Sequence, residues 1–162
     1  MKLELAIVSD THWHESNQDL ERLVHRLYGA QFILHAGDVV SPVVVSALET
    51  VAPVLAVVGN CCQAALRERF PLQRVEEFSG LQVGMLHGHL VNLEDPDAIV
   101  AKFPAETRLC IHGHTHLARN QLCGDVWIFN PGSVSQPRWG SPPTYGWATW
   151  EDGKLLLEHR MF

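Results

Sequence analysis

The sequence predicts an α/β fold in which a parallel sheet is followed by antiparallel strands. Over the first two thirds of the chain, short apolar runs alternate with helix-length amphipathic segments, a pattern typical of βαβ units. Over the last third, strand-like runs follow one another through short turns with no room for helices. With 162 residues and 46% hydrophobic residues, a single domain over residues 1–162 is expected.

The first three predicted elements form a βαβ unit. Residues 3–8 (LELAIV) and residues 32–36 are apolar runs that predict buried strands, and a helix is expected between them over residues 17–28. A right-handed crossover makes the two strands parallel. Asp10 and Asp38 then emerge at the same edge of the sheet, which is where open α/β sheets bind their ligands.

The alternation continues with shorter elements. Further helices are expected over residues 42–49, 63–69 and 94–103. Further strands are expected over residues 53–58, 75–78, 81–86, 109–111, 118–122, 126–129, 145–150 and 155–159. We expect the last four of these strands to form a second, antiparallel set.

Each of five successive predicted strands ends in side chains that can bind a metal ion. A mixture of carboxylate, amide and imidazole ligands suits Mn²⁺, Fe²⁺ or Zn²⁺. Taken singly, each residue has an ordinary alternative as a cap, turn or loop residue. Together the set is sufficient for two ions if one carboxylate bridges them: Asp10, His12, Asp38, Asn60, His87, His114 and His116.

Residues 111–116 (IHGHTH) hold the densest group of histidines in the chain. Two imidazoles that are two residues apart lie on the same side only if the backbone stays extended, so an extended backbone is expected here. Gly113 permits a tight turn or a close approach to a ligand. For this stretch alone, the alternatives are a solvated loop and a satisfied pair of core histidines.

A two-metal site predicts the reaction class. Two ions about 3.5–4 Å apart act on the attacking and leaving oxygens of a displacement at phosphorus, and a water that bridges them becomes hydroxide near neutral pH. We therefore expect phosphoester hydrolysis without a covalent intermediate. No arginine clamp for a dianionic phosphate is evident near the motifs, so a phosphodiesterase is favoured and a phosphomonoesterase is the alternative. For Arg138, exposure to solvent is expected, and the alternative is that it reaches the pocket.

The motifs resemble those of the calcineurin-like metallophosphoesterases, in particular the small single-domain bacterial and archaeal phosphodiesterases related to the retromer subunit Vps29. The resemblance covers nearly the whole chain in the order Asp10-x-His12, Gly37-Asp38, Gly59-Asn60, His87-Gly88-His89, Gly113-His114-Thr115-His116 and Phe129-Asn130-Pro131-Gly132-Ser133. It implies a two-layered αββα sandwich of mixed β-sheets flanked by helices, with the second sheet formed by the C-terminal strands.

The resemblance also implies roles for the ligands. One metal ion would be held by Asp10, His12, Asp38 and His116, and the other by Asp38, Asn60, His87 and His114. Asp38 would bridge the two. Mn²⁺ is the expected ion, with Fe²⁺, Zn²⁺, Ni²⁺ and Co²⁺ as alternatives.

The chain departs from the family at Cys61 and Cys62, where many members have His and an acid after the asparagine. The family histidine is thought to help protonate the leaving oxygen, so we expect a preference for diesters with good leaving groups. His89 is a candidate replacement acid, and its alternative role is to hydrogen-bond a metal ligand. We assign Asp38, Asn60 and His89 to catalysis.

Net charge, hydropathy and cysteine spacing argue against several other classes of function. A net charge of −6 argues against nucleic acid as a partner, and no segment is long and apolar enough to span a membrane. The start of the chain does not resemble a signal peptide, and the four cysteines lack disulfide or zinc-finger spacing, so a cytoplasmic protein is expected. A small phosphoester substrate and a homodimer are the expected partners. The alternative outside catalysis is a Vps29-like scaffold.

Overall fold

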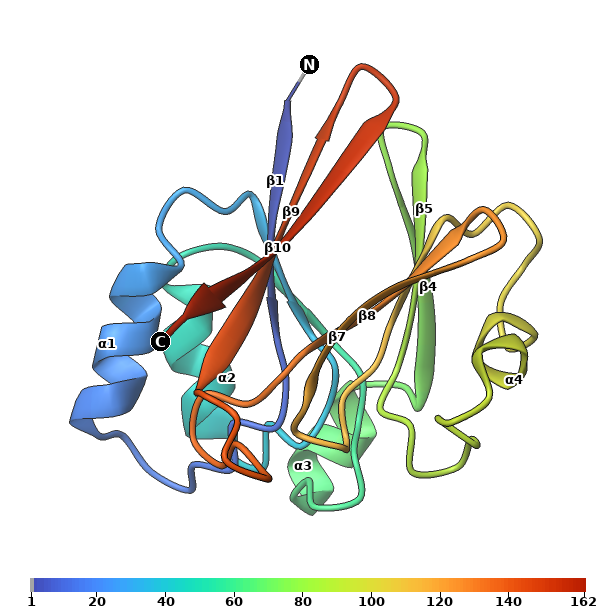
Figure 1. Ribbon diagram of the computed structural model, residues 1–162. Coiled ribbons are helices and arrows are strands. Elements are labelled where there is room, and N and C mark those ends of the chain that lie inside the picture. The colour runs from blue at the N-terminus through green and yellow to red at the C-terminus, as the bar shows by residue number, and fades with distance from the viewer. Residues whose placement is uncertain (1) are drawn as a thin grey trace.

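Two five-stranded sheets pack face to face in the computed structural model, which describes residues 2–162 (Figure 1). The first sheet has the order β10-β9-β1-β2-β3 and the second β4-β5-β6-β8-β7. The strands are β1 (Leu3–Val8), β2 (Phe32–His35), β3 (Val54–Ala56), β4 (Gln73–Phe78), β5 (Leu81–Leu86), β6 (Leu109–Ile111), β7 (Ala118–Cys123), β8 (Val126–Pro131), β9 (Thr144–Glu151) and β10 (Lys154–Met161).

Both sheets are mixed, which confirms the predicted fold class. In the first sheet β1, β2 and β3 are parallel, β9 is antiparallel to β1, and β10 is antiparallel to β9 at the edge. In the second sheet β5, β6 and β8 are parallel, with β4 and β7 antiparallel at the two edges. The expectation that the C-terminal strands form the second sheet is confirmed for β7 and β8 and was wrong for β9 and β10, which belong to the first sheet. β9 joins the first sheet because β1 has a second edge whose backbone groups require partners.

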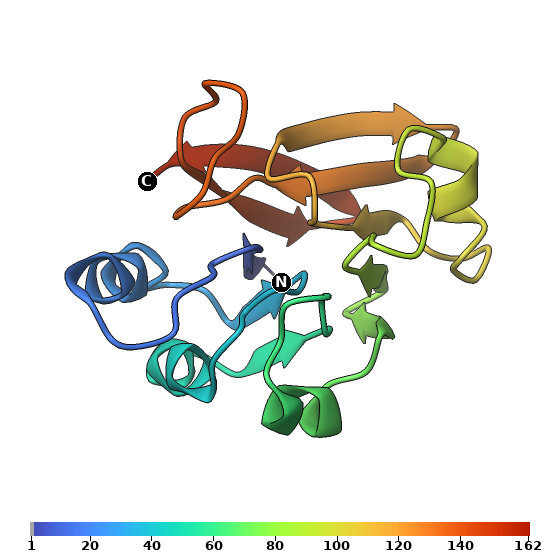
Figure 2. The same cartoon turned by 90° about the horizontal axis from the view of Figure 1, so that it is seen from below.

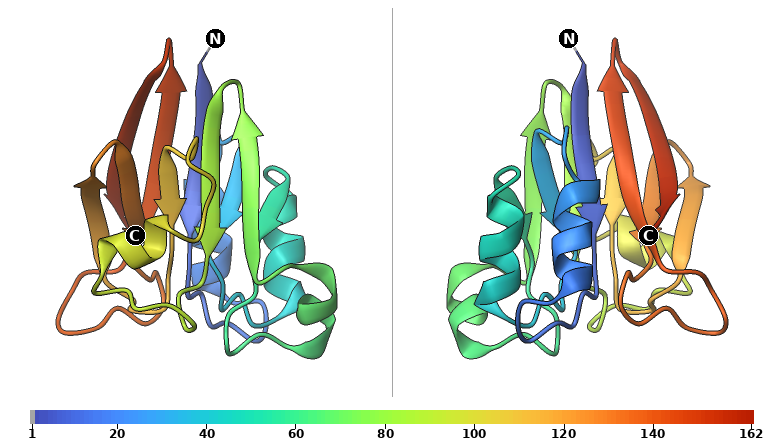
Figure 3. Two further views of the ribbon diagram at one scale, coloured as in Figure 1. Left: turned by 90° about the vertical axis from the view of Figure 1, so that its right-hand side faces the viewer. Right: turned by 90° about the vertical axis from the view of Figure 1, so that its left-hand side faces the viewer.

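Helices cover the outer faces of the sandwich (Figures 2 and 3). Helices α1 (Gln18–Arg26) and α2 (Pro42–Glu49) pack on the first sheet, and α4 (Pro96–Val100) packs on the second. α3 (Ala64–Arg69) precedes β4. α4 is shorter than the expected helix over residues 94–103, because Asp95 caps it and the chain turns after Ala101.

The core between the sheets consists mainly of aliphatic side chains, with the rings of Phe78 and Phe129 among them. Leu5, Ile7 and Leu34 of the first sheet meet Met85 and Phe129 of the second, and all five are buried. This packing fixes the distance between the sheets, and thereby the distance between the loops at their ends. Among the described residues, the longest apolar helical stretch is too short for a membrane span.

Candidate metal centre

The carboxyl ends of β1, β2, β3, β5 and β6 lie at one edge of the sandwich, the lower edge in Figure 1. Figure 2 is seen from below, so the loops that follow these strands face the viewer. Each predicted ligand follows one of these strands within a few residues. The edge therefore receives side chains from both sheets.

The acidic and imidazole groups converge on a small volume. The Nε2 atom of His87 lies 3.2 Å from Oδ2 of Asp38, and Nε2 of His116 lies 3.2 Å from Oδ1 of Asp10. Nε2 of His12 lies 3.5 Å from Oδ2 of Asp38 and 3.3 Å from Nε2 of His116. These five side chains form what we call the ligand cluster, and their nitrogen and oxygen atoms are close enough to share metal ions.

The backbone at the cluster is strained. Asp10, His12, Asp38, His114 and His116 have φ values of 51°, 49°, 52°, 70° and 60°, in the left-handed region that non-glycine residues rarely adopt. The expectation of an extended backbone over residues 111–116 was therefore wrong. Tight turns after β6, instead of a continued strand, bring the imidazoles to the cluster. Such strain persists where the surrounding structure enforces it and is concentrated at functional sites.

Two glycines allow the loops to approach closely. A Cβ atom on Gly59 would lie 2.0 Å from Oδ1 of Asp38. A Cβ atom on Gly113 would lie 2.0 Å from Oγ of Ser9 and 2.6 Å from Oδ2 of Asp10. Neither position accepts any side chain without displacing a carboxylate of the cluster.

Hydrogen bonds orient the two buried histidines. Nδ1 of His87 donates to the carbonyl of Ala36 at 2.8 Å, and Nδ1 of His116 donates to the carbonyl of Gln136 at 2.7 Å. A proton on Nδ1 leaves the lone pair on Nε2, the atom that faces the carboxylates. This is the arrangement found in metal-ligating histidines, whose other nitrogen is held by a carbonyl or carboxylate.

Two buried polar atoms at the centre lack hydrogen-bond partners. Asp10 is fully buried, and its Oδ2 accepts from the hydroxyl of Ser9 at 2.6 Å and from the amide of His114 at 3.0 Å. Within residues 2–162, Oδ1 of Asp10 and Nε2 of His87 are buried with no such partner. An unpaired buried polar atom is costly. A divalent cation would satisfy both atoms, so the residues present fit the metal that the motifs imply.

Electrostatics keep both carboxylates ionised. Burial opposes ionisation of Asp38, but the nearby imidazole of His87 lowers its pKa to about 2. Burial likewise opposes ionisation of Asp10, yet the nearby imidazoles of His116 and His12 hold its pKa well below the ordinary value. In return, the carboxylates raise the pKa of His87 and His116 against the effect of burial. Two ionised carboxylates therefore lie at the centre of the cluster.

The other predicted residues lie around this centre. The ring of His114 is 5.2 Å from that of His87, and the ring of His89 is 5.5 Å from that of His87. Asn60 is exposed, and its Nδ2 donates to the sulfur of Cys61 at 3.3 Å. The structure thus brings all the sequence-predicted residues to one edge, with the Asn60 amide turned toward Cys61.

Three supporting residues were not identified from the sequence. Arg67 donates from Nη2 to the carbonyl of Asn60 at 2.8 Å and from Nε to that of Cys62 at 2.9 Å. Ser133 donates from Oγ to the carbonyl of Asp10 at 2.8 Å, and Ser9 binds the Asp10 carboxylate. Ser9 could have been found from its place beside Asp10 at a strand end, and Ser133 from the motif that ends in it, whereas Arg67 has no local signal.

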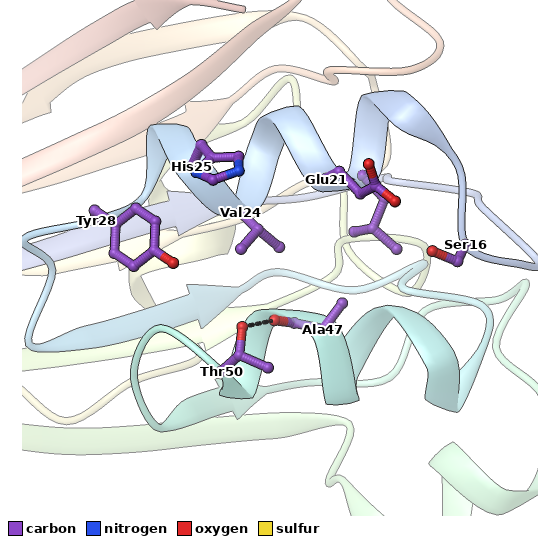
Figure 4. A pocket seen from close by; sticks show the side chains of 8 residues that line it. Ser16, Glu21, Val24, His25, Tyr28, Ala47 and Thr50 are labelled. Carbon is purple, nitrogen blue, oxygen red and sulfur yellow. Dashed lines mark hydrogen bonds between the residues drawn. The ribbon is translucent and has the colours of Figure 1, made fainter.

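The surface has hollows both away from the cluster and beside it. One, of about 290 Å³, lies between α1 and α2 and is lined by Glu21, Val24 and Tyr28 among others (Figure 4). It shares no residue with the cluster and is not the site of the predicted chemistry. Another, of about 210 Å³, is lined by His87 and His89 together with apolar side chains, and so adjoins the cluster.

Comparison with known proteins identifies the family. The model of the calcineurin-like phosphoesterase superfamily domain matches residues 3–153. The chain belongs to this superfamily. It is 31% identical to a probable metallophosphoesterase of Methanothermobacter thermautotrophicus over 140 residues, covering 85% of this chain and 81% of that protein. It is 32% identical to the Escherichia coli phosphodiesterase YfcE over 165 residues, covering 89% and 86%.

Solved structures agree with this assignment. The E. coli phosphoesterase YfcE superposes with a TM-score of 0.71 at 27% identity, covering 98% of this chain and 99% of that one. Vps29 of Entamoeba histolytica in complex with Zn²⁺ superposes with a TM-score of 0.73 at 21% identity, covering 98% and 99%. The second likeness shows the shared fold alone. The resemblance noted in the sequence is thereby confirmed.

Proposed function

We propose that this chain is a divalent-metal-dependent phosphodiesterase with a two-metal site. The observation that carries the proposal is the pair of buried, unpaired atoms, Oδ1 of Asp10 and Nε2 of His87, at the centre of the ligand cluster. Asp10, His12, Asp38 and His116 would hold one ion, and Asp38, Asn60, His87 and His114 the other. Bound divalent ions would supply the positive charge that stabilises negative charge developing at phosphorus.

Hydrogen bonds within the protein hold the proposed metal ligands in position. His87 and His116 hold their Nε2 lone pairs toward the centre through the hydrogen bonds on Nδ1. Asp38 is fixed by the amide of Cys61, which donates to its Oδ1 at 2.8 Å. Preorganised groups of this kind need no rearrangement when charge develops in the transition state. The phosphodiesterase YfcE, similar in sequence and fold, supports the choice of a diester.

The proposed substrates are diesters with good leaving groups. Burial lowers the pKa of His89, so this imidazole is neutral at neutral pH and a poor proton donor. Burial and Asp38 raise the pKa of Cys61, whose thiol retains its proton. Neither group is matched to protonating a strongly basic alkoxide at neutral pH. Rates over a series of aryl and alkyl diesters should fall steeply as the pKa of the leaving alcohol rises, and a flat dependence would contradict this preference.

The function is tested with metal-stripped protein and a chromogenic phosphodiester. Hydrolysis should rise as Mn²⁺ is titrated in and fall by at least about 100-fold in Asp38→Asn. The matched control is Asp125→Asn, which removes an exposed carboxylate in the turn between β7 and β8 and should retain full activity. Bound metal is counted by elemental analysis in each variant. A wild-type protein that binds no metal would refute the proposal and favour the scaffold alternative.

A further inference from the structure

The loop between β8 and β9 brings an arginine and a tryptophan to the rim of the ligand cluster. In this loop, the carbonyl of Gln136 accepts a hydrogen bond from Nδ1 of His116 at 2.7 Å, and its amide donates to Oγ of Ser133 at 2.9 Å. Ser133 in turn binds the carbonyl of Asp10. The start of the loop is thus fixed to two members of the cluster. In Figure 2 the loop lies beside the segment that follows β1.

Trp139 in this loop is exposed to solvent and has an unfavourable backbone conformation. Its side chain is 89% exposed, and its φ of 55° places a bulky residue in the left-handed region. The amide of Ser141 donates to the carbonyl of Arg138 at 2.9 Å and stabilises the turn. By contrast, Trp147 on β9 is 4% exposed and packs in the core. An exposed, strained tryptophan next to a strained site indicates a function outside the core.

Arg138 and Trp139 follow Gln136 by two and three residues. Consecutive Cα atoms are 3.80 Å apart, so the Cα of Trp139 is at most about 11 Å from that of Gln136, and the Cα of Arg138 at most about 8 Å. The carbonyl of Gln136 itself lies 2.7 Å from Nδ1 of His116, a member of the cluster. The exposed guanidinium of Arg138 is a positive charge on this loop and would attract an anionic substrate.

We propose that Arg138 and Trp139 form a substrate-binding arm for phosphodiesters that carry a flat aromatic group. The guanidinium of Arg138 pairs with a non-bridging oxygen of the phosphodiester. The indole of Trp139 stacks on the aromatic ring of the ester group that is retained after hydrolysis, as aromatic side chains do on nucleobases. The inference rests on the proposed function and adds the substrate class, either a nucleoside or a simple aryl diester.

Three p-nitrophenyl phosphodiesters test the arm, with methyl, naphthyl or thymidine as the second ester group. They share a leaving group, so differences report on the retained group alone. For the Mn²⁺-loaded wild type, we expect KM to be about 10-fold lower for the aromatic esters than for the methyl ester. Trp139→Ala should abolish this difference while kcat changes less than about twofold, and Trp139→Phe should restore most of it. Preference for thymidine over naphthyl identifies a nucleoside substrate, and the reverse identifies an aryl one.

Further variants distinguish loss of the substrate-binding arm from a general loss of folding or activity. Arg138→Ala should raise KM for all three esters, with partial rescue in Arg138→Lys. Leu122→Ala removes an exposed apolar side chain on β7 and should change none of these values. Equal KM values for the methyl and aromatic esters in the wild type would overturn the proposal, as would an equal rise for all three esters in Trp139→Ala.

A binding measurement distinguishes failure of the arm from failure of the proposed function. Thymidine monophosphate, added to metal-loaded protein, should quench tryptophan fluorescence in the wild type and not in Trp139→Ala. If no diester is hydrolysed but this quenching is seen, the phosphodiesterase proposal fails and the arm stands as a binding site. If quenching is the same in both proteins, the arm is refuted whatever the activity.

Discussion

The two sheets make unequal contributions to the ligand cluster. The loops of the first sheet supply both carboxylates, Asp10 and Asp38, and the loops of the second supply His87 and His116. Each carboxylate would raise the pKa of the other by repulsion if it stood alone, and the imidazoles of the other sheet reverse that effect. Neither sheet alone therefore contains a complete metal site. The site exists because packing of the core holds the two loop systems in register.

Backbone groups also join the two loop systems directly. The amide of His114 donates to Oδ2 of Asp10 at 3.0 Å, and Nδ1 of His87 donates to the carbonyl of Ala36 at 2.8 Å. Gly113 lies against Ser9 and Asp10 in the same region, and we call this set of contacts between the two loop systems the joint. Changes at this joint should have the largest effects, and changes within one sheet smaller ones.

Gly113→Ala should have the largest effect. The added methyl group overlaps Ser9 and the Asp10 carboxylate, and such overpacking costs about 1–3 kcal/mol of folding stability. We expect metal-dependent activity to fall by at least about 100-fold, since small displacements of catalytic groups have effects of this size. Gly124→Ala, in an open turn with φ of 59°, is the control and should lose some stability but no activity. Full activity in Gly113→Ala would show that the joint is not needed.

The next largest effect is expected in a double-mutant cycle between Asp38 of the first sheet and His87 of the second. Asp38→Asn and His87→Gln should each lower kcat by about 100-fold or more, and the double variant should be little worse than either, because groups that act as a unit are not additive. The measurement is single-turnover hydrolysis with Mn²⁺ present. Fully additive losses would mean that the two sheets contribute independently.

The pH dependence of folding tests a histidine that belongs to one sheet only. His35 on β2 is fully buried, its Nδ1 accepts from the amide of Gly37, and burial lowers its pKa from 6.5 to about 4. Below pH 6.5 the unfolded chain takes up a proton that the folded chain excludes, so stability is lost as the pH falls toward 4. The expected loss is on the order of 3 kcal/mol, measured by urea unfolding of metal-free protein.

The variant His35→Gln isolates this contribution. It should be less stable than the wild type at pH 7, because a well-packed residue is replaced, but should lose less stability between pH 7 and pH 4. His87 and His116, with raised pKa values, act in the opposite sense and are unchanged in the variant. Identical pH slopes in both proteins would show that His35 does not exclude its proton.

The smallest effect is expected at Arg67. Its guanidinium donates to the carbonyls of Asn60 and Cys62, so Arg67→Ala should loosen that loop at a cost of about 1 kcal/mol. Because the loop carries a proposed ligand, Mn²⁺ affinity should fall by about 10-fold, as for other residues that support metal ligands. Arg69→Ala removes an exposed ion pair with Glu49 and is the control. Equal affinity in both variants would exclude a supporting role for Arg67.

The sequence by itself determined the element order, the fold class and the residue types at the strand ends. Apolar runs such as residues 3–8 and caps such as Asn17 are local signals, and local signals place elements. The predicted ligands were found because each directly follows a strand, and parallel strands deliver their ends to one edge. Local pattern did not reveal that β9 pairs with β1, since either sheet offers an edge to an apolar strand.

Only the tertiary structure decided how these residues meet. The left-handed backbone at Asp10 and Asp38 is held by hydrogen bonds between segments far apart in the chain, such as that from the amide of His114 to Asp10. Periodicity reports which face of an element is buried, and it carries no information about which distant loop lies opposite. That information arises when the two apolar faces pack, because packing brings carboxylates of one sheet against imidazoles of the other.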